Sequence, residues 1–243
     1  MGSRRDELAA AVDRVRERID AACRAAGRDP AEVRLLAVTK TFPASDVVEL
    51  AGLGLLDVAE ARDQEAVPKI AEVATLRPAR PAIRWHLVGR LQRNKARSVA
   101  RWADQVQSVD SVRLVEALDR ACRNAQEAGE REGPLGVLVQ ASLDGDPSRG
   151  GCPLAGLDAL AEQVAAAPAL RLQGVMAVAP LGAEPGPAFA DLAAAAQRLR
   201  RDHPEALEVS AGMSGDLESA VAQGSTCVRV GTALLGGRRL ASR

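Results

Sequence analysis

The sequence predicts a (β/α)₈ barrel, also called a TIM barrel, in which eight parallel strands form a closed ring inside a layer of helices, with one extra helix at the N-terminal end. Eight short apolar runs alternate strictly with seven helical patterns along the chain. Runs of this kind, rich in β-branched residues, are typical of a parallel sheet buried on both faces. The length of 243 residues also suits such a barrel, which takes roughly 250 residues. A doubly wound open sheet is the alternative.

The predicted elements follow one another at regular intervals. The chain opens with an amphipathic segment at about residues 6–26, where apolar residues recur at helical spacing. The predicted strands are residues 33–39, 55–59, 83–88, 105–109, 136–142, 170–177, 207–210 and 226–230. The predicted helices between them are residues 44–53, 60–76, 91–103, 111–130, 154–167, 186–202 and 214–223.

The loops favour the barrel over the open sheet. The turn after the first strand lacks the Gly-x-Gly-x-x-Gly pattern of a dinucleotide site, whereas the loops after the seventh and eighth strands are rich in Gly, Ser and Thr. Barrels often bind phosphate at those two loops. We therefore predict a single domain over residues 1–243, with turn-rich loops at 143–153 and 180–187. The N-terminal helix could replace a missing eighth outer helix or cover the barrel floor, and the sequence leaves both open.

The composition excludes several classes of protein. The 32 basic residues balance the 32 acidic ones and 47% of residues are apolar, so we expect neither a disordered chain nor a charge suited to nucleic acid or membrane surfaces. No apolar run approaches the roughly 18 residues of a membrane span, and the N-terminal residues lack a signal-peptide core. We expect a cytoplasmic protein. The four cysteines are scattered, which predicts free thiols and no metal site.

Lysine is scarce, and one lysine occupies a position suited to chemistry. Of the 32 basic residues only Lys40, Lys69 and Lys95 are lysines. Lys40 ends the first predicted strand, at the edge where barrel enzymes carry their reactive groups. Burial there would favour the neutral, nucleophilic amine that forms Schiff bases. The alternative is a lysine that extends its ammonium group into water.

Two loops could together bind an anion. Ser210 ends the seventh predicted strand, Gly212 permits close backbone approach, and Ser214 can cap the next helix. Gly231 and Thr232 follow the eighth strand. Their joint occurrence after the last two strands favours a phosphate site, although each pattern alone also fits an ordinary helix start.

Two side chains on predicted strands each have two possible roles. Arg229 lies in an otherwise apolar strand. Pointing inward it would need an acceptor such as a ring nitrogen or an acid, and pointing outward it would pair with an acid near the helices. His86, in the third strand, could act as an acid or base or be held by structural hydrogen bonds.

A run of six basic residues without an acid extends from residue 84 to residue 101. Four of them, Arg90, Arg93, Arg97 and Arg101, fall on one face of the predicted helix. Such a stripe could bind RNA or a partner protein. Because no aromatic residues are interleaved with it, a solvated face is the preferred interpretation.

These motifs resemble, in order and spacing, those of the pyridoxal phosphate homeostasis protein family. The resemblance runs from about residue 5 to residue 238. The segments that carry it are LAVTK at 36–40, WHLVGRLQRNK at 85–95, SAGMS at 210–214 with Asp216, and GSTCVRVGT at 224–232.

The resemblance implies a barrel similar to the N-terminal domain of alanine racemase, with pyridoxal 5′-phosphate held as a Schiff base on Lys40 and with Arg229 as the partner of its pyridine nitrogen. The implied phosphate cup consists of Ser210, Met213, Ser214, Gly231 and Thr232. An arginine at that nitrogen weakens the cofactor as an electron sink. This fits the role of the family in vitamin B6 balance without established turnover. We expect pyridoxal phosphate, and the apoenzymes that use it, as partners of a monomer, with no membrane or nucleic-acid partner.

One segment departs from the family pattern. Where relatives typically carry Phe-Gly-Glu-Asn after the second strand, this chain has Val58, Ala59, Glu60 and Ala61. Loss of the glycine and the asparagine removes possible hydrogen bonds beside the cofactor. We expect pyridoxal phosphate still to bind, with lower affinity or altered release.

The alternative function is a racemase-like enzyme that uses the same cofactor. Racemisation needs a proton donor on each face of the substrate carbanion. Alanine racemase supplies its second base as a tyrosine from an added β-domain, whereas this sequence ends soon after the barrel and has no tyrosine. The sequence therefore argues against racemisation by that mechanism and leaves His86 as the first candidate for a different second base.

Overall fold

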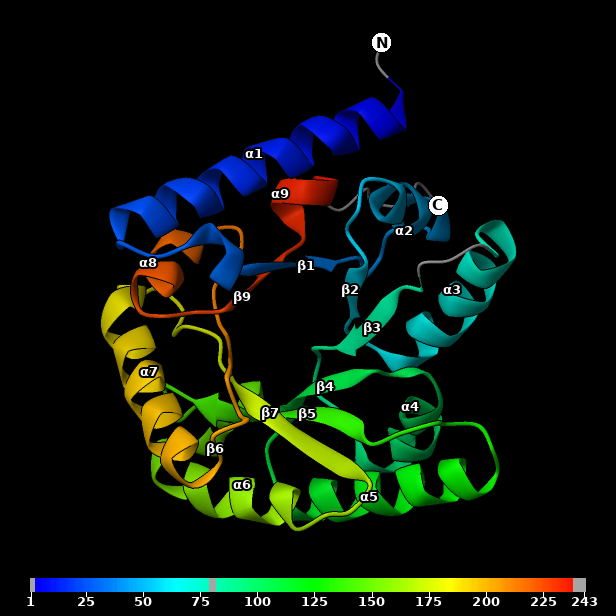
Figure 1. Cartoon of the computed structure of the whole chain (residues 1–243), viewed down its shortest axis with the longest axis vertical. Helices are drawn as coiled ribbons and strands as arrows, with labels where there is room; N and C mark the ends of the chain where they lie inside the picture. Colours follow the sequence, from blue (N-terminus) through cyan, green and yellow to red (C-terminus); the bar gives the residue numbers. More distant parts are fainter. Residues whose placement is uncertain (1–2, 79–81, 238–243) are drawn as a thin grey trace.

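The computed structural model describes residues 3–78 and 82–237, and it confirms the closed parallel barrel (Figure 1). Eight strands pair in the order β4-β3-β2-β1-β9-β8-β7-β5, and pairing between β4 and β5 closes the ring. The eight predicted strands are all present, with ends shifted by at most two residues. The strands are β1 (Arg34–Val38), β2 (Asp57–Glu60), β3 (Arg84–Leu87), β4 (Gln105–Val109), β5 (Leu135–Ser142), β6 (Cys152–Pro153), β7 (Leu170–Met176), β8 (Glu208–Ser210) and β9 (Cys227–Val230).

Helices surround this ring (Figure 1). The α-helices are α1 (Arg4–Ala25), α2 (Ala44–Gly52), α3 (Asp63–Leu76), α4 (Ala96–Trp102), α5 (Val112–Glu127), α6 (Leu157–Ala165), α7 (Pro185–Asp202), α8 (Leu217–Ala222) and α9 (Thr232–Leu235). Short 3₁₀ turns lie at Pro30–Glu32, Arg93–Lys95, Pro147–Arg149 and Leu154–Gly156. Within the described part of the chain, no helix combines the length and the apolar character needed to cross a membrane.

Helix α1 takes the place of an outer helix. It begins at a capping box, in which the Ser3 hydroxyl accepts from the backbone N–H of Asp6 and the Asp6 carboxylate accepts from that of Ser3. Its apolar face, which includes Val12 and Ile19, is buried in one core cluster with outward-facing residues of β1, β2 and β9. Because α9 has only four residues, α1 fills the position beside α8 and α2, as Figure 1 shows. This decides the alternative that the sequence left open.

Four predicted helices, α3, α4, α6 and α8, begin at least three residues later than expected. Glu60 still belongs to β2, and α3 begins only at Asp63. Helix α4 begins at Ala96, because the chain stays extended at Gln92 and then forms a 3₁₀ turn. This path buries the side chain of Leu91 in the core.

The prediction of four arginines on one helical face is therefore wrong. Arg97 and Arg101 belong to α4, whereas Arg93 lies in the 3₁₀ turn and Arg90 in the loop before it. The predicted loop at 143–153 also contains structure that the sequence did not reveal, because Cys152–Pro153 pairs in parallel with the end of β5 as β6.

The interior of the barrel is polar over much of its length. Only Leu36, Val38, Ala59 and Cys227 form an apolar cluster there, with Val88 packed against it. Leu138 and Met176 are further buried apolar residues on strands. Many of the other buried strand positions carry polar side chains, which belong to Asp57, His86, Gln105, Gln107, Ser210 and Arg229. Hydrogen bonds, rather than apolar contacts alone, must therefore hold this core.

Candidate functional site

The predicted site residues come from three neighbouring strands. Strand β9 pairs with both β1 and β8, so the carboxyl ends of these strands lie side by side at one mouth of the barrel. Gly231, directly after β9, packs against Val38 at the end of β1. A Cβ atom added at Gly231 would lie 3.2 Å from the Val38 carbonyl oxygen. The fold thus brings the loop that carries Lys40 against the loop that carries Gly231 and Thr232.

Lys40 is exposed, so the expectation of a buried amine is wrong. Strand β1 ends at Val38, and Lys40 lies in the turn that follows, before Thr41 at a positive φ of 66°. A positive φ is rare for a residue with a branched side chain. Lys40 is therefore placed at the mouth by a constrained turn rather than by burial.

A buried cluster that the sequence analysis missed lies directly beneath this turn. The Thr39 hydroxyl donates to Glu60 Oε1 at 2.7 Å. Lys69, on α3, donates from Nζ to the same Glu60 oxygen at 2.7 Å and to the Thr39 carbonyl oxygen at 2.8 Å. Lys69 and Glu60 are 9% and 0% exposed. One signal could have revealed this cluster, since Lys69 is one of only three lysines and is followed by an apolar helical pattern.

The two loops of the predicted phosphate cup are joined by a hydrogen bond. The backbone N–H of Ala233 donates to Ser214 Oγ at 3.2 Å, which ties the loop after β8 to the start of α9. The Met213 N–H already donates to Asp216 Oδ1 at 2.6 Å. Met213 is 37% exposed, and its loop bends at Gly212, where φ is 91°. The two loops that carry the predicted cup are thus held together by hydrogen bonds.

Ser210 and Arg229 lie deeper, inside the barrel. Arg229 Nη1 donates to the carbonyl oxygen of Ser210 at 2.7 Å and to its Oγ at 2.8 Å, and Nη2 donates to the carbonyl oxygen of Ala177 at 2.8 Å. Among the described residues these bonds use three of the five N–H groups of the guanidinium. Burial lowers the pKa of Arg229 below its ordinary value. An inward arginine with donors to spare is suited to an acceptor atom on a ligand.

His86 does not face Lys40 as a free base. Its ring nitrogens lie 2.8 Å from Gln105 Oε1 and 2.9 Å from Asp57 Oδ1. The ring is 2% exposed. The alternative of a hydrogen-bonded structural histidine is thus the one that the geometry supports.

A large open cavity of about 1110 Å³ lies over the carboxyl ends of β2, β3 and β4. Ala61, a position at which the resemblance led us to expect asparagine, lines this cavity. Its rim also includes Arg90, Arg93, Lys95 and Arg113. The basic run noted in the sequence therefore contributes to a cavity wall rather than to a single helix face.

Known proteins are similar to this chain over nearly its whole length. Residues 11–239 match the family model for the alanine racemase N-terminal domain. The pyridoxal phosphate homeostasis protein of Mycobacterium leprae is 50% identical, over 99% of this chain and 96% of its own length. The one from Escherichia coli K12 is 39% identical, over 96% of this chain and 97% of its own length.

Solved structures agree in fold. PipY of Synechococcus elongatus, solved with pyridoxal phosphate bound, has a TM-score of 0.79 and 35% identity, covering 94% of this chain and 100% of its own. Alanine racemase of Corynebacterium glutamicum has a TM-score of 0.67 at 15% identity, covering 98% of this chain and 62% of its own. At that identity the likeness to the racemase concerns the fold alone.

Proposed function

We propose that this chain binds pyridoxal 5′-phosphate as a Schiff base on Lys40 and serves the supply of the cofactor rather than catalytic turnover. The proposal starts from the family, because the chain belongs to the pyridoxal phosphate homeostasis protein family. The observation that carries this proposal is the contact of Gly231 with Val38. It sets the loop of the only exposed lysine among three against the loops of the phosphate cup. One compact cofactor could then reach all of them.

The chemistry of the surrounding groups fits this cofactor. Ser214, Gly231 and Thr232 lie at the surface of the mouth, where a phosphate would keep contact with water. Arg229 lies inward, where an aromatic ring nitrogen would find the donors that the protein leaves free. When bound, pyridoxal phosphate supplies an aldehyde that condenses with amines and a ring that can accept electrons.

Arg229 supports a carrier over a catalyst. A cationic donor at the ring nitrogen disfavours protonation of that nitrogen, which makes the ring a weaker electron sink. Burial lowers the pKa of Arg229, but the guanidinium is effectively never deprotonated in proteins. The arginine therefore opposes the electron withdrawal that most reactions at an amino acid need.

The racemase alternative finds less support. It needs a second proton-transferring group opposite Lys40, and the sequence contains no tyrosine. Both nitrogens of His86 are already engaged by Asp57 and Gln105. An assay for interconversion of D- and L-alanine tests this alternative, and we expect no turnover above the rate of free pyridoxal phosphate.

The attachment of the cofactor can be tested directly. Purified protein is incubated with pyridoxal phosphate, its visible absorption band is recorded, and the adduct is reduced with borohydride and located by peptide mass spectrometry. We expect the band and the modified peptide in the wild type and in Lys95→Ala, and neither in Lys40→Ala. An unchanged adduct in Lys40→Ala contradicts the assignment of Lys40.

A further inference from the structure

A continuous chain of hydrogen bonds runs through the barrel core from Arg229 to Asp57. Its first step is the bond from Arg229 Nη1 to Ser210 Oγ at 2.8 Å. The Ser210 hydroxyl then donates to Gln107 Oε1 at 2.7 Å. Gln107 Nε2 donates to Gln105 Oε1, also at 2.7 Å.

The chain continues through His86, whose ring nitrogens join Gln105 to Asp57. Every member is at most 9% exposed. His86 and Gln105 also line a cavity of about 520 Å³.

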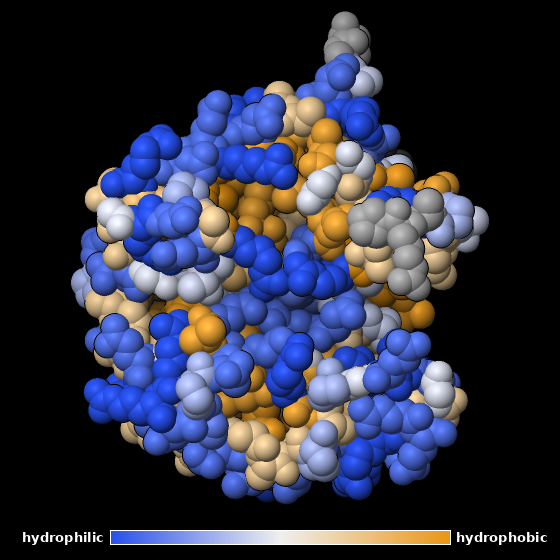
Figure 2. Space-filling view, viewed as in Figure 1, coloured by the Kyte–Doolittle hydropathy of each residue, from blue (hydrophilic) through white to orange (hydrophobic). Residues whose placement is uncertain are grey.

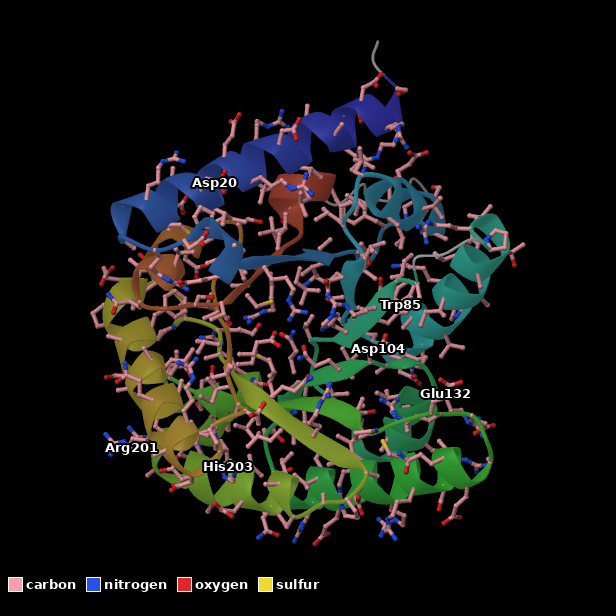
Figure 3. All side chains as sticks on the ribbon, in the orientation of Figure 1. Asp20, Trp85, Asp104, Glu132, Arg201 and His203 are labelled. Atoms are coloured by element: carbon pink, nitrogen blue, oxygen red, sulfur yellow. The ribbon has the colours of Figure 1, made fainter. Side chains whose placement is uncertain are left out.

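In Figure 3, Trp85 and Asp104 lie side by side at the start of β3 and just before β4. The backbone N–H of Trp85 donates to Asp104 Oδ2 at 2.7 Å. Figure 2 shows hydrophilic side chains gathered over the middle of the face that it presents.

The directions of these bonds fix where protons lie. Gln105 Nε2 donates to Gln173 Oε1 at 2.7 Å and to Glu208 Oε2 at 2.9 Å. This places the acceptor oxygen of Gln105 toward His86. His86 Nδ1 faces that oxygen and Nε2 faces a carboxylate oxygen of Asp57, so each ring nitrogen has to carry a proton to make its bond.

The opposite arrangement creates a conflict. A neutral ring with its proton on Nε2 needs a donor at Nδ1, which requires the Gln105 amide to be reversed. Its oxygen would then lie against Glu208 Oε2, and its nitrogen against the nitrogen of Gln107. Two acceptors or two donors facing each other in a buried site leave polar groups unpaired, which is costly.

The surrounding charges are compatible with a charged ring. Arg34 donates from Nη1 to Asp57 Oδ1 at 2.8 Å, and Arg84 donates from Nη2 to Asp57 Oδ2 at 2.5 Å. Arg34 also donates from Nη2 to Glu208 Oε1 at 2.5 Å. Burial alone would raise the pKa of Asp57, but hydrogen bonds from His86 and Arg84 and the charge of Arg34 hold it well below its ordinary value. Asp57 is therefore a carboxylate that accepts from three partners.

We propose that His86 is a positioning residue for Arg229. Held as an imidazolium between Asp57 and Gln105, it stabilises, together with Glu208, the direction of the hydrogen bonds through Gln107. The Ser210 hydroxyl then points at Gln107 and leaves its oxygen to accept from Arg229. This inference rests on the proposed function only where it concerns the ligand, since Arg229 is the group assigned to the ring nitrogen. The proton on His86 is a property of the protein alone.

Nitrogen NMR of protein labelled with ¹⁵N-histidine tests the first part without any ligand. The chain contains two histidines, and His203→Gln assigns the signals. We expect His86 to show two protonated ring nitrogens near neutral pH. A neutral ring with one protonated nitrogen overturns the proposal.

The second part is tested by cutting the chain at Gln107. Gln107→Leu removes the link between Ser210 and Gln105, whereas Gln140→Leu is a matched control, because Gln140 is buried on a neighbouring strand but donates to the Arg149 carbonyl oxygen instead. Loss of one buried hydrogen-bond partner changes an affinity by on the order of tenfold. We expect the dissociation constant for pyridoxal phosphate to rise by that factor in Gln107→Leu and to stay within about twofold in Gln140→Leu.

A spectroscopic readout separates positioning from general damage to the fold. Addition of pyridoxal phosphate should shift the His86 nitrogen signals in the wild type and leave them unchanged in Gln107→Leu, whose cooperative thermal unfolding shows that it is folded. An unchanged dissociation constant in Gln107→Leu, or an equal response of His86 in both proteins, overturns the positioning role. Failure of the wild type to bind pyridoxal phosphate contradicts instead the proposed function, while the ligand-free NMR result still decides the proton on His86.

Discussion

Lys69 Nζ lies 2.8 Å from the carbonyl oxygen of Thr39, the residue that directly precedes Lys40. The same ammonium group is paired with Glu60 at 2.7 Å. A lysine on α3 thus holds the backbone of the turn that carries another, exposed lysine. Under the proposed function, the buried lysine would hold the turn and the exposed one would take the cofactor.

Replacing Lys69 by methionine should destabilise the fold strongly. The change leaves Glu60 as a buried charge without its partner, which costs about 3–5 kcal/mol in comparable pairs. Urea denaturation measures the free energy of unfolding, with Lys95→Met as the control, because Lys95 is only half-buried. The double change Glu60→Gln with Lys69→Met should recover part of the lost free energy of unfolding. A free energy of unfolding for Lys69→Met alone within about 0.5 kcal/mol of the wild type would contradict the role of the pair.

Replacing Gly231 by alanine should loosen the contact between the two loops of the site. The added Cβ would lie 3.2 Å from the Val38 carbonyl oxygen and 3.4 Å from Val38 Cβ. Overpacking of this kind costs about 1–3 kcal/mol. Thermal unfolding and pyridoxal phosphate titration measure the effect. Gly215→Ala is the matched control, because a Cβ there meets nothing within 4 Å. Equal behaviour of the two variants would refute the close approach.

Stability should fall in acid because of Asp57. Despite burial, its hydrogen bonds with His86 and Arg84 and the charge of Arg34 hold its pKa well below the ordinary value. A lowered pKa in the folded state stabilises the protein above the unfolded pKa of about 4, and this contribution is lost as the pH falls below that value. Denaturant titrations across this range measure it. In Asp57→Asn the free energy of unfolding should be lower at neutral pH and should depend less steeply on pH in acid.

The four cysteines should differ in reactivity toward thiol reagents. Burial raises the pKa of Cys227 to about 12 and that of Cys122 to about 11, and Cys23 is buried as well. Cys152 is only half-buried. Because the thiolate is the reactive form, brief alkylation of the native protein followed by mass spectrometry should label Cys152 first. Prior labelling of Cys227 would show that the barrel opens readily.

The sequence could predict the barrel because its strands are local features. Runs such as residues 33–39 are mostly apolar, bounded by turn residues, and separated by helical patterns, so their position needs no knowledge of their neighbours. The start of α4 could not be predicted in this way. The helical pattern in the sequence begins at Leu91, but the Leu91 side chain is buried in the core and the helix begins later, at Ala96. This late start depends on tertiary packing, which the local pattern does not contain.

The site was predictable in part for the same reason. Lys40, Arg229 and Gly231 lie at strand ends, where parallel strands bring residues together. The pairing of Lys69 with Glu60 could not be predicted, because it depends on how α3 turns against β2. The bond from the Ser210 hydroxyl to Gln107 Oε1 likewise depends on the stagger of strands around the ring, which no pattern within a strand encodes.

The packing of α1 has a consequence for synthesis. Arg18 of this helix donates from Nη2 to the Ser214 carbonyl oxygen at 3.0 Å and is paired with Glu218 at 2.8 Å. Helix α1 is therefore anchored to a loop 196 residues later in the chain, and β1 completes its hydrogen bonds only when β9 arrives. A nascent chain cannot assemble the mouth of the barrel until the residues through Thr232 have left the ribosome. Ligand capture at this mouth would thus mark a chain whose ring has closed.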